Sequence, residues 1–314
     1  MKYLITGGAG FIGSHLAETL LKDKNNFVTI VDQVDNELYP KEEKIRNLKE
    51  ISETVKHNNL VILQESINTF VNKGNKNKFD VVVNLAATPG LPLSWVNFST
   101  YLKNNTEATF EIVKWAHEVN CSKFVQISTS SVYGKMALGD ENSSLKPFSP
   151  YGVSKLAAEN IVLTFFQNYN FNCSILRLFS VYGPRQRPDM AFNIFIKNIL
   201  KGNEFEIFGD GSQSRTNSYI SDITDGILKA TNNSKPGEIY NLCGNESISI
   251  NYALEVIQSV IGKKAKIKFA ARRPGDQKET NGISKKAQLD FNFSASTSFE
   301  DGIQNQISWQ SKID

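Results

Sequence analysis

Residues 2–13 of this chain read Lys2-Tyr3-Leu4-Ile5-Thr6-Gly7-Gly8-Ala9-Gly10-Phe11-Ile12-Gly13. The apolar start predicts a strand, the glycines predict a tight turn, and the residues after Gly13 have helical spacing. In this context glycines let the backbone approach a pyrophosphate, whose charge is stabilised by the N-terminus of the helix. The stretch therefore predicts a dinucleotide-binding site formed by Gly7, Gly10, Phe11, Ile12 and Gly13.

A second apolar run, residues 27–31, ends in Asp32, nineteen residues after Gly13. A carboxylate at this place can accept hydrogen bonds from both hydroxyls of an adenosine ribose. The alternative is a tight turn with a solvent-facing Asp, but strand, spacing and acid together favour the dinucleotide site. Asp32 repels a 2′-phosphate, and neither Gln33 nor Val34 offers a cation to hold one. We therefore expect NAD rather than NADP as the cofactor.

The composition is that of an ordinary globular protein, with 314 residues, 40% hydrophobic and 21% charged. A net charge of +3 is too small to indicate nucleic-acid binding. The three cysteines and three histidines lack metal-ligand spacing, so we predict no metal site. His15, in the first helix, is expected to be structural. No apolar stretch reaches membrane-spanning length and no signal peptide is visible, so we expect a cytoplasmic protein without a membrane partner.

Strands and helices alternate along the first part of the chain. Apolar runs predict strands at 60–63, 80–85, 124–128 and 173–178, and helical spacing predicts helices at 41–55, 98–119 and 151–168. This order indicates an α/β fold with a Rossmann-type doubly wound parallel sheet. After residue 183 the pattern is less regular, with helices expected near 191–200, 221–231, 250–261 and 298–309. We therefore expect an NAD-binding domain over 1–180 and a smaller substrate-binding lobe mainly over 181–314, with some chain crossing between them.

Three residues are candidates for catalysis. Thr129 ends a predicted strand, and Tyr151 and Lys155 share one face of the following helix at spacing i, i+4. A phenol with a pKa of about 10 is a poor base, but a neighbouring ammonium and a positive nicotinamide ring favour the phenolate. Tyr151 can then take a proton from a sugar hydroxyl that Thr129 orients. The alternative, a packed tyrosine beside a solvated lysine, is disfavoured by the preceding dinucleotide motif.

Many further motifs occur in a characteristic order along the chain: Asn84-Leu85-Ala86-Ala87, Asn105, the turn at 181–184, Phe208-Gly209-Asp210-Gly211, Arg215 and Arg273-Pro274-Gly275-Asp276. Together with the glycine turn and the Tyr/Lys pair, they resemble the extended short-chain dehydrogenase/reductase family, in its branch of NAD-dependent nucleotide-sugar epimerases and dehydratases. The resemblance implies tightly held NAD and catalysis by Thr129, Tyr151 and Lys155.

The resemblance also implies the remaining site residues. On the cofactor side these are Ser66, Ile67, Leu85, Ala86, Ala87 and Asn105, besides Tyr151 and Lys155. Arg215 and Arg273 would grip the nucleotide and diphosphate of the substrate, a task that suits the fork of a guanidinium. The full substrate set is Thr88, Ser94, Thr129, Ser130, Ser180, Arg185, Arg187, Phe192, Phe208, Arg215, Arg273 and Asp276.

The two residues after Thr129 separate the branches of this family. Members that dehydrate the sugar carry an acidic pair there, and decarboxylating members keep a glutamate at the second position, whereas this chain has Ser130 and Ser131. We therefore expect C4 epimerisation of a UDP-sugar through a 4-keto intermediate. Residues 128–134, 149–155 and 181–192 resemble bacterial UDP-glucuronic acid 4-epimerases, which favours UDP-glucuronate over UDP-glucose and UDP-N-acetylglucosamine. In that reading Thr129, Ser130, Ser180 and Arg185 would surround the C5 carboxylate.

Two other functions stay open at this point. The same residues could serve a 4-ketoreductase or 4-dehydrogenase of a UDP- or GDP-sugar, which would stop after one hydride transfer. A non-catalytic NAD(H)-binding regulator is disfavoured because Tyr151 and Lys155 are both kept. The chain departs from the usual family pattern at Ser66, Pro92, Thr216, Asn217 and Asn281-Gly282. The resemblance further implies a homodimer in which the helices at 98–119 and 151–168 form a four-helix bundle.

Overall fold

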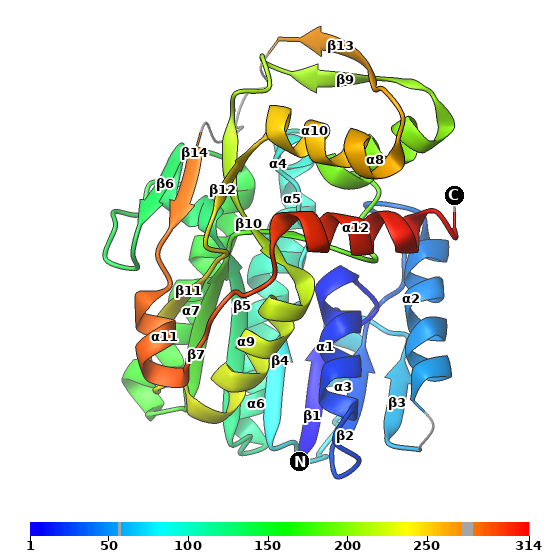
Figure 1. Ribbon diagram of the computed structural model, residues 1–314. Coiled ribbons are helices and arrows are strands. Elements are labelled where there is room, and N and C mark those ends of the chain that lie inside the picture. The colour runs from blue at the N-terminus through cyan, green and yellow to red at the C-terminus, as the bar shows by residue number, and fades with distance from the viewer. Residues whose placement is uncertain (56–57, 272–278, 314) are drawn as a thin grey trace.

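The computed structural model describes residues 1–55, 58–271 and 279–313. Within these residues a parallel sheet of seven strands forms the centre, in the order β11-β7-β5-β4-β1-β2-β3 (Figure 1). The strands are β1 (Lys2–Thr6), β2 (Phe27–Val31), β3 (Leu60–Leu63), β4 (Val81–Asn84), β5 (Lys123–Thr129), β7 (Cys173–Leu178) and β11 (Ile239–Leu242). Every neighbouring pair is parallel. The predicted Rossmann-type doubly wound sheet is confirmed.

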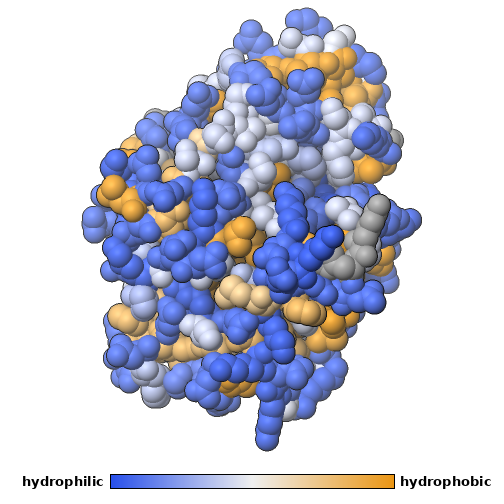
Figure 2. Space-filling view, turned by 60° about the horizontal axis from the view of Figure 1, so that its bottom comes forward, coloured by the Kyte–Doolittle hydropathy of each residue, from blue (hydrophilic) through white to orange (hydrophobic). Residues whose placement is uncertain are grey.

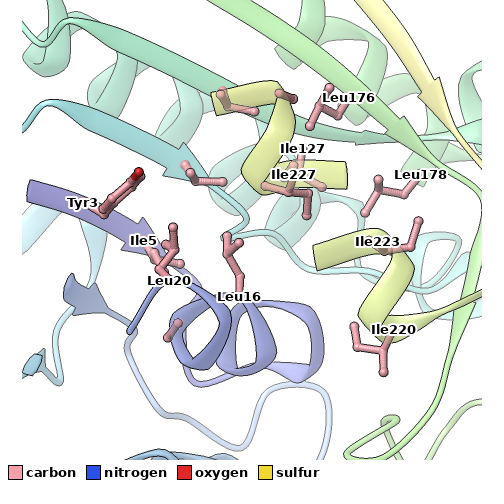
Figure 3. Packing of buried hydrophobic residues seen from close by; sticks show 14 of the residues in the cluster. Tyr3, Ile5, Leu16, Leu20, Ile127, Leu176, Leu178, Ile220, Ile223 and Ile227 are labelled. Atoms are coloured by element: carbon pink, nitrogen blue, oxygen red, sulfur yellow. The ribbon is translucent and has the colours of Figure 1, made fainter. Parts of the chain in front are cut away.

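Helices cover both faces of this sheet, which is why its strands are apolar on both sides. One face carries α1 (Phe11–Leu21), α2 (Lys41–Thr54), α9 (Ile220–Asn233) and α11 (Lys285–Phe291). Figure 3 shows Leu16 and Leu20 of α1 and Ile223 of α9 packed in this layer. The other face carries α3 (Ile67–Asn72), α6 (Ala108–Glu118) and α7 (Pro150–Tyr169). The core therefore lies in two layers, one on each side of the sheet.

The predicted helix at 98–119 is composite. It consists of α5 (Phe98–Tyr101), a π-helical segment η1 (Leu102–Glu107) and α6. Single π turns occur mostly at functional sites, and η1 lies beside the end of β4. Sequence analysis did not predict α3 and α11, because six or seven residues give too few apolar positions to establish a period.

The smaller lobe consists of two further sheets and the helices α8 (Ala191–Lys201), α10 (Ile250–Ile261) and α12 (Phe299–Gln310). One sheet has the order β12-β10-β14-β6 with β8 beside β10, and the other pairs β13 with β9. Its strands are β6 (Met136–Gly139), β8 (Ser180–Tyr182), β9 (Glu204–Phe208), β10 (Ser214–Tyr219), β12 (Ser247–Ser249), β13 (Lys266–Ala270) and β14 (Glu279–Gly282).

The chain passes between the two parts more than once. β6 comes from the first half of the chain but belongs to the smaller lobe, whereas α9, β11 and α11 come from the second half and pack with the parallel sheet. The division into an NAD-binding domain over 1–180 and a substrate-binding lobe mainly over 181–314 stays a prediction.

The face shown in Figure 2 is mostly hydrophilic, and its apolar residues form small separate patches. In the parts of the chain that the structure describes, no helix has both the length and the apolar character needed to cross a membrane.

Candidate active site

Two adjoining cavities lie at the carboxyl ends of the parallel strands, where open α/β sheets bind ligands. A groove of about 460 Å³ runs past the ends of β1, β2, β4 and β5. A larger cavity of about 1320 Å³ lies between the sheet and the smaller lobe. Ser180, Val181 and Met190 line both. The two cavities therefore meet at β8 and the loop that follows it.

The glycine turn forms the floor of the groove. Gly7 has a φ of +71°, and a Cβ on it would lie 2.8 Å from the backbone nitrogen of Ala86. A Cβ on Gly13 would collide with the carbonyl oxygen of Gly7. No side chain caps α1, whose N-cap is Gly10, so its first N–H groups are left to the groove. This close backbone approach at a helix N-terminus fits a dinucleotide pyrophosphate.

Asp32 stands at the rim of the groove, directly after β2. Its carboxylate accepts hydrogen bonds from the backbone N–H of Ala9, at 3.1 Å, and of Val34, at 2.9 Å. Lys44 of α2 also lines the groove, with its Nζ 3.6 Å from Asp32 and 3.2 Å from Asp35. Sequence analysis missed this cation because it weighed only the residues next to Asp32.

The other expected cofactor residues divide into two groups. Ser66, Ile67, Leu85, Ala86 and Ala87 line the groove, and the hydroxyl of Ser66 also caps α3 by accepting from Thr69 N–H at 3.1 Å. Asn105 is fully buried behind the wall. Its amide binds the backbone N–H of Thr88 at 2.7 Å and the hydroxyl of Ser154 at 3.0 Å. The structure therefore places Asn105 behind the groove, and among the described residues its neighbour Asn104 lines the groove.

The three catalytic candidates meet in the groove, which Thr129, Tyr151 and Lys155 all line. The helix α7 begins just before Tyr151, since Ser149 caps it and Pro150 occupies its first turn. Thr129, at the end of β5, shares a hydrogen bond with the Tyr151 side chain. Lys155 donates to the carbonyl of Ile127 at 2.7 Å. The end of β5 and the start of α7 therefore bring together Thr129 and Tyr151, which are more than twenty positions apart in the sequence.

Burial dominates the electrostatics of this trio. Burial raises the pKa of Tyr151, whereas the hydrogen bond with Thr129 and the charge of Arg187 act in the opposite direction. Burial lowers the pKa of Lys155 to about 8, which Glu159 on the next helical turn partly offsets. The expectation that an ammonium and a positive nicotinamide ring together favour the phenolate stays a prediction; among the protein groups, Thr129 and Arg187 act in that direction.

A buried ion pair lies behind Lys155, and sequence analysis did not identify it. Glu159 receives a bidentate interaction from Arg177, at 2.7 Å for the closest N–O pair, and a hydrogen bond from Ser128 at 2.5 Å. Both charged side chains are almost completely buried. Glu159 thus lies one helical turn from Lys155, and its buried negative charge is balanced by the guanidinium of Arg177.

The expected substrate residues are spread over both cavities. Ser94, Phe192, Phe208 and Arg215 line the larger one, and Ser180 lines both. Thr88, Thr129 and Arg187 line the groove. Arg273 and Asp276 lie outside the described residues. Among further lining residues that sequence analysis missed are Trp95, Phe148, Gln186, Gln213 and Ile250.

Two expected substrate residues, Ser130 and Arg185, lie elsewhere. Both are buried, and neither is among the described residues that line the two cavities. Ser130 is enclosed in the short 3-10 helix η2 (Ser130–Tyr133). The guanidinium of Arg185 binds Glu18 at 2.8 Å and Glu50 at 2.6 Å. The structure therefore does not bring Arg185 together with the other expected substrate residues.

His15 is structural, as expected. Its Nε2 lies 2.9 Å from the carbonyl oxygen of Pro184, and burial together with the charge of Arg185 lowers its pKa to about 4. Searching the described part of the chain for three or more His, Cys, Asp or Glu side chains placed to hold a metal ion finds no such group.

Comparison with known proteins finds likeness along the whole chain. The family model described as "NAD dependent epimerase/dehydratase family" matches residues 3–243. A Bacillus subtilis (strain 168) protein described as an uncharacterized UDP-glucose epimerase is 39% identical over 318 residues, covering 100% of this chain and 99% of the relative. The UDP-glucuronate 4-epimerase of Thermodesulfobacterium geofontis (strain OPF15) is 35% identical over 317 residues, covering 98% of this chain and 95% of that protein.

Among solved structures, a similar one is UDP-glucuronic acid 4-epimerase from Bacillus cereus in complex with UDP-glucuronic acid and NAD. It superposes with a TM-score of 0.95 at 36% identity, and the match covers 100% of both chains. The likeness therefore extends over the groove, the larger cavity and the lobe that encloses it.

Proposed function

The chain belongs to the NAD dependent epimerase/dehydratase family, and we propose that it is a 4-epimerase of UDP-glucuronate. The family and these relatives make the protein an NAD-dependent nucleotide-sugar epimerase, which agrees with the resemblance drawn from its motifs. The identity of the sugar is the proposed part. The observation that carries it is the full-length likeness to a solved UDP-glucuronic acid 4-epimerase, at a TM-score of 0.95.

The residues after Thr129 support epimerisation over dehydration. A dehydratase must protonate a departing hydroxyl, and Ser130 and Ser131 offer no acid for that step. Asp189, a carboxylate that lines the larger cavity, is bound to Arg187 through two hydrogen bonds of 2.9 Å. The chemistry that remains is the removal and return of a hydride at one carbon and of a proton at the hydroxyl of that carbon.

In the proposed reaction Tyr151 takes the proton of the C4 hydroxyl, which Thr129 orients by a hydrogen bond. NAD, when bound in the groove, supplies the hydride acceptor and donor. Lys155 keeps its ammonium near the phenol and favours the phenolate. The 4-keto sugar would then rotate in the larger cavity, whose volume of about 1320 Å³ leaves room for this. C4 would accept the hydride back on its other face while Tyr151 returns the proton to the C4 oxygen.

Recognition of the substrate is divided between the two cavities. Arg187 faces the groove beside Tyr151 and is our choice for the C5 carboxylate, together with Ser180, which lines both cavities. Arg215, with Phe208 nearby in the larger cavity, would hold the nucleotide end. A guanidinium is suited to both tasks because it binds carboxylate and phosphate oxygens in pairs.

We also propose a homodimer formed by α5–η1–α6 and α7. Two aromatic residues of these helices, Tyr101 and Phe165, are buried within one copy of the chain. Phe110 is 42% exposed, and Val153 and Phe98 on the same helices are exposed as well. These side chains could contact a second copy. A mass near that of one chain in light scattering would contradict the dimer.

The proposed function is tested by incubating the purified protein and NAD, without reductant, separately with UDP-glucuronate, UDP-glucose, UDP-N-acetylglucosamine and a GDP-sugar. Products are identified by NMR. We expect conversion of UDP-glucuronate to its C4 epimer, with NAD retained through purification. Conversion of another sugar alone would correct the substrate. Accumulation of NADH with a keto sugar would overturn epimerisation in favour of a 4-dehydrogenase.

A further inference from the structure

Arg185 has an unusual backbone and an unusual set of partners. Its φ of +62° lies in the left-handed region, which a non-glycine residue occupies mainly where the surroundings enforce it. Its side chain is 6% exposed. All three guanidinium nitrogens donate to carboxylates: Nη1 and Nη2 to Glu18 at 3.0 and 2.8 Å, and Nε to Glu50 at 2.6 Å. The side chain therefore compensates for the strained backbone.

The partners of Arg185 belong to the nucleotide-binding part of the molecule. Glu18 lies on α1, the helix that follows the glycine turn, and Glu50 lies on α2. His15, also on α1, adds a contact to the carbonyl of Pro184 at 2.9 Å. Arg185 thus ties the start of the loop 183–190 to two helices that are 135 and 167 positions away in the sequence.

The opposite side of this loop is held by the smaller lobe. Gln306 of α12 accepts from Gly183 N–H at 2.9 Å and donates to the side chain of Gln186 at 2.9 Å. Gln186 in turn accepts from the N–H of Asn193 in α8 at 3.0 Å. The loop is therefore clamped between α1 and α2 on one side and α8 and α12 on the other.

The residues that follow Arg185 reach the reaction centre. Arg187 lines the groove together with Tyr151, and its partner Asp189 lines the larger cavity. The groups around the Tyr151 phenol are Thr129 from β5, Tyr101 from α5, Lys155 from its own helix and Arg187 from the loop. Tyr101 and Thr129 are uncharged, so the loop contributes, through Arg187, a second cation in addition to that of Lys155.

We propose that Arg185 is a positioning residue, which binds Glu18 and Glu50 and thereby fixes the loop 183–190 so that Arg187 faces Tyr151. This inference rests on the proposed role of Tyr151 as the catalytic base. It assigns Arg185 no contact with the substrate. Arg185 affects catalysis through Arg187, so its substitution should have little effect on catalysis in a protein that lacks the Arg187 side chain.

The test uses a variant that removes the side chain without leaving strain or buried charge: Arg185→Gly combined with Glu18→Gln and Glu50→Gln. Glycine adopts the left-handed backbone freely, and the two amides replace carboxylates that would lose their partner. This triple variant, Arg187→Met and their combination are compared with the wild type in kcat, KM, NAD content and thermal midpoint. The control, Lys286→Met with Glu238→Gln, removes an ion pair between α11 and the start of β11.

A displacement of a catalytic group by about 1 Å can cost up to a hundredfold in rate, so we expect the triple variant to lose about tenfold in kcat. In the Arg187→Met background the same three changes should cost less than about twofold, because coupled residues are not additive. NAD content should stay at the wild-type level, and the control should change the thermal midpoint without changing kcat. If the losses in kcat of the triple variant and of Arg187→Met multiplied in their combination, the positioning role would be overturned. A loss of bound NAD that parallels the loss in kcat would overturn it as well.

A second readout does not depend on the sugar. The ultraviolet titration of each protein is compared with that of its Tyr151→Phe counterpart, so that the difference reports the Tyr151 phenol alone. We expect the triple variant and Arg187→Met to shift this titration to higher pH by the same amount. An unchanged titration in the triple variant would refute the positioning role, even if the substrate panel assigned a different sugar or no epimerase activity.

Discussion

The groove and the larger cavity differ in the atoms that form their walls: backbone atoms form the floor of the groove, and side chains bound the larger cavity. The groove floor is backbone: the turn at Gly7 approaches Ala86 so closely that a single Cβ would collide there. The larger cavity is bounded by side chains from both parts of the molecule, such as Phe148, Phe192, Phe208 and Arg215. A site built from backbone tolerates almost no side-chain change, whereas a site built from side chains can be altered one residue at a time. We expect the cofactor to be the constant element of this enzyme and the sugar the adjustable one.

The largest effect is expected at the reaction centre in the groove. Tyr151→Phe removes the proton acceptor and should reduce kcat by about a thousandfold or more, with bound NAD unchanged. The control is Tyr169→Phe, an exposed tyrosine on the same helix. The activity is measured on whichever nucleotide sugar the wild type converts. A variant that keeps a tenth of the wild-type rate would show that another group accepts the proton.

The next largest effect should come from the groove floor. Gly7→Ala combines a left-handed φ with a collision against Ala86, and we expect at least about a hundredfold weaker NAD binding because the turn must open. Gly74→Ala is a matched control, since Gly74 has a similar φ of +65° but nothing within 4 Å of the added Cβ. Calorimetric titration with NAD compares the two. Equal effects of both substitutions would mean that strain, and not the close approach, is what matters.

A smaller effect is expected from one side chain of the larger cavity. Arg215→Met should raise KM about tenfold with little change in kcat, because the lost contact binds ground state and transition state alike. Lys266→Met, on the exposed strand β13, is the control for loss of a positive charge. Steady-state kinetics separate the two parameters. If kcat fell instead, Arg215 would act on the reacting sugar, and the contrast between the two cavities would be weaker.

The smallest effect on catalysis is expected at His15, which joins α1 to the loop between the cavities. Its folded-state pKa of about 4 lies below the unfolded value of about 6.5. The unfolded chain therefore binds more protons between these values, and stability falls as pH decreases from about 6.5 to about 4. His15→Gln should reduce this slope. Thermal unfolding of both proteins at pH 7 and 4.5 measures it, and parallel curves would show that other groups cause the acid sensitivity.

The cofactor side could be predicted almost residue by residue, and the reason is local. The glycine turn, Asp32 and the segments after β3 and β4 each follow a strand directly, so the order of the strands in the sheet places them along one edge. Asn105 is different because it lies within a helix, where it depends on the winding of η1 whether Asn104 or Asn105 lines the groove. A π-helical turn rotates the side chains away from their usual 3.6-residue positions, and no motif marks it.

The substrate side could be predicted only in part. Phe208 and Arg215 line the larger cavity as expected, because they flank the turn between β9 and β10. The role of Arg185 could not be predicted from the sequence. Arg185 and Arg187 are two positions apart in one motif, but their side chains bind different partners in different parts of the molecule. Arg185 binds carboxylates on α1 and α2, whereas Arg187 binds Asp189 at the junction of the cavities. The direction of each depends on the left-handed backbone at Arg185, which the sequence does not indicate because glycine is the residue that favours this conformation.

The parallel sheet, the nucleotide-binding edge and the shared helix face of Tyr151 and Lys155 could be predicted from the chain, because they follow from strand order and helical spacing. Three features became visible only in the folded protein: which arginine reaches the reaction centre, the position of Lys44 beside Asp32, and the buried pair of Glu159 and Arg177 behind Lys155. The difference lies in the range of the interactions. Hydrogen bonds within a turn or helix connect neighbours in the sequence, whereas ion pairs such as Arg185 with Glu18, 167 positions apart, exist only after the chain has folded.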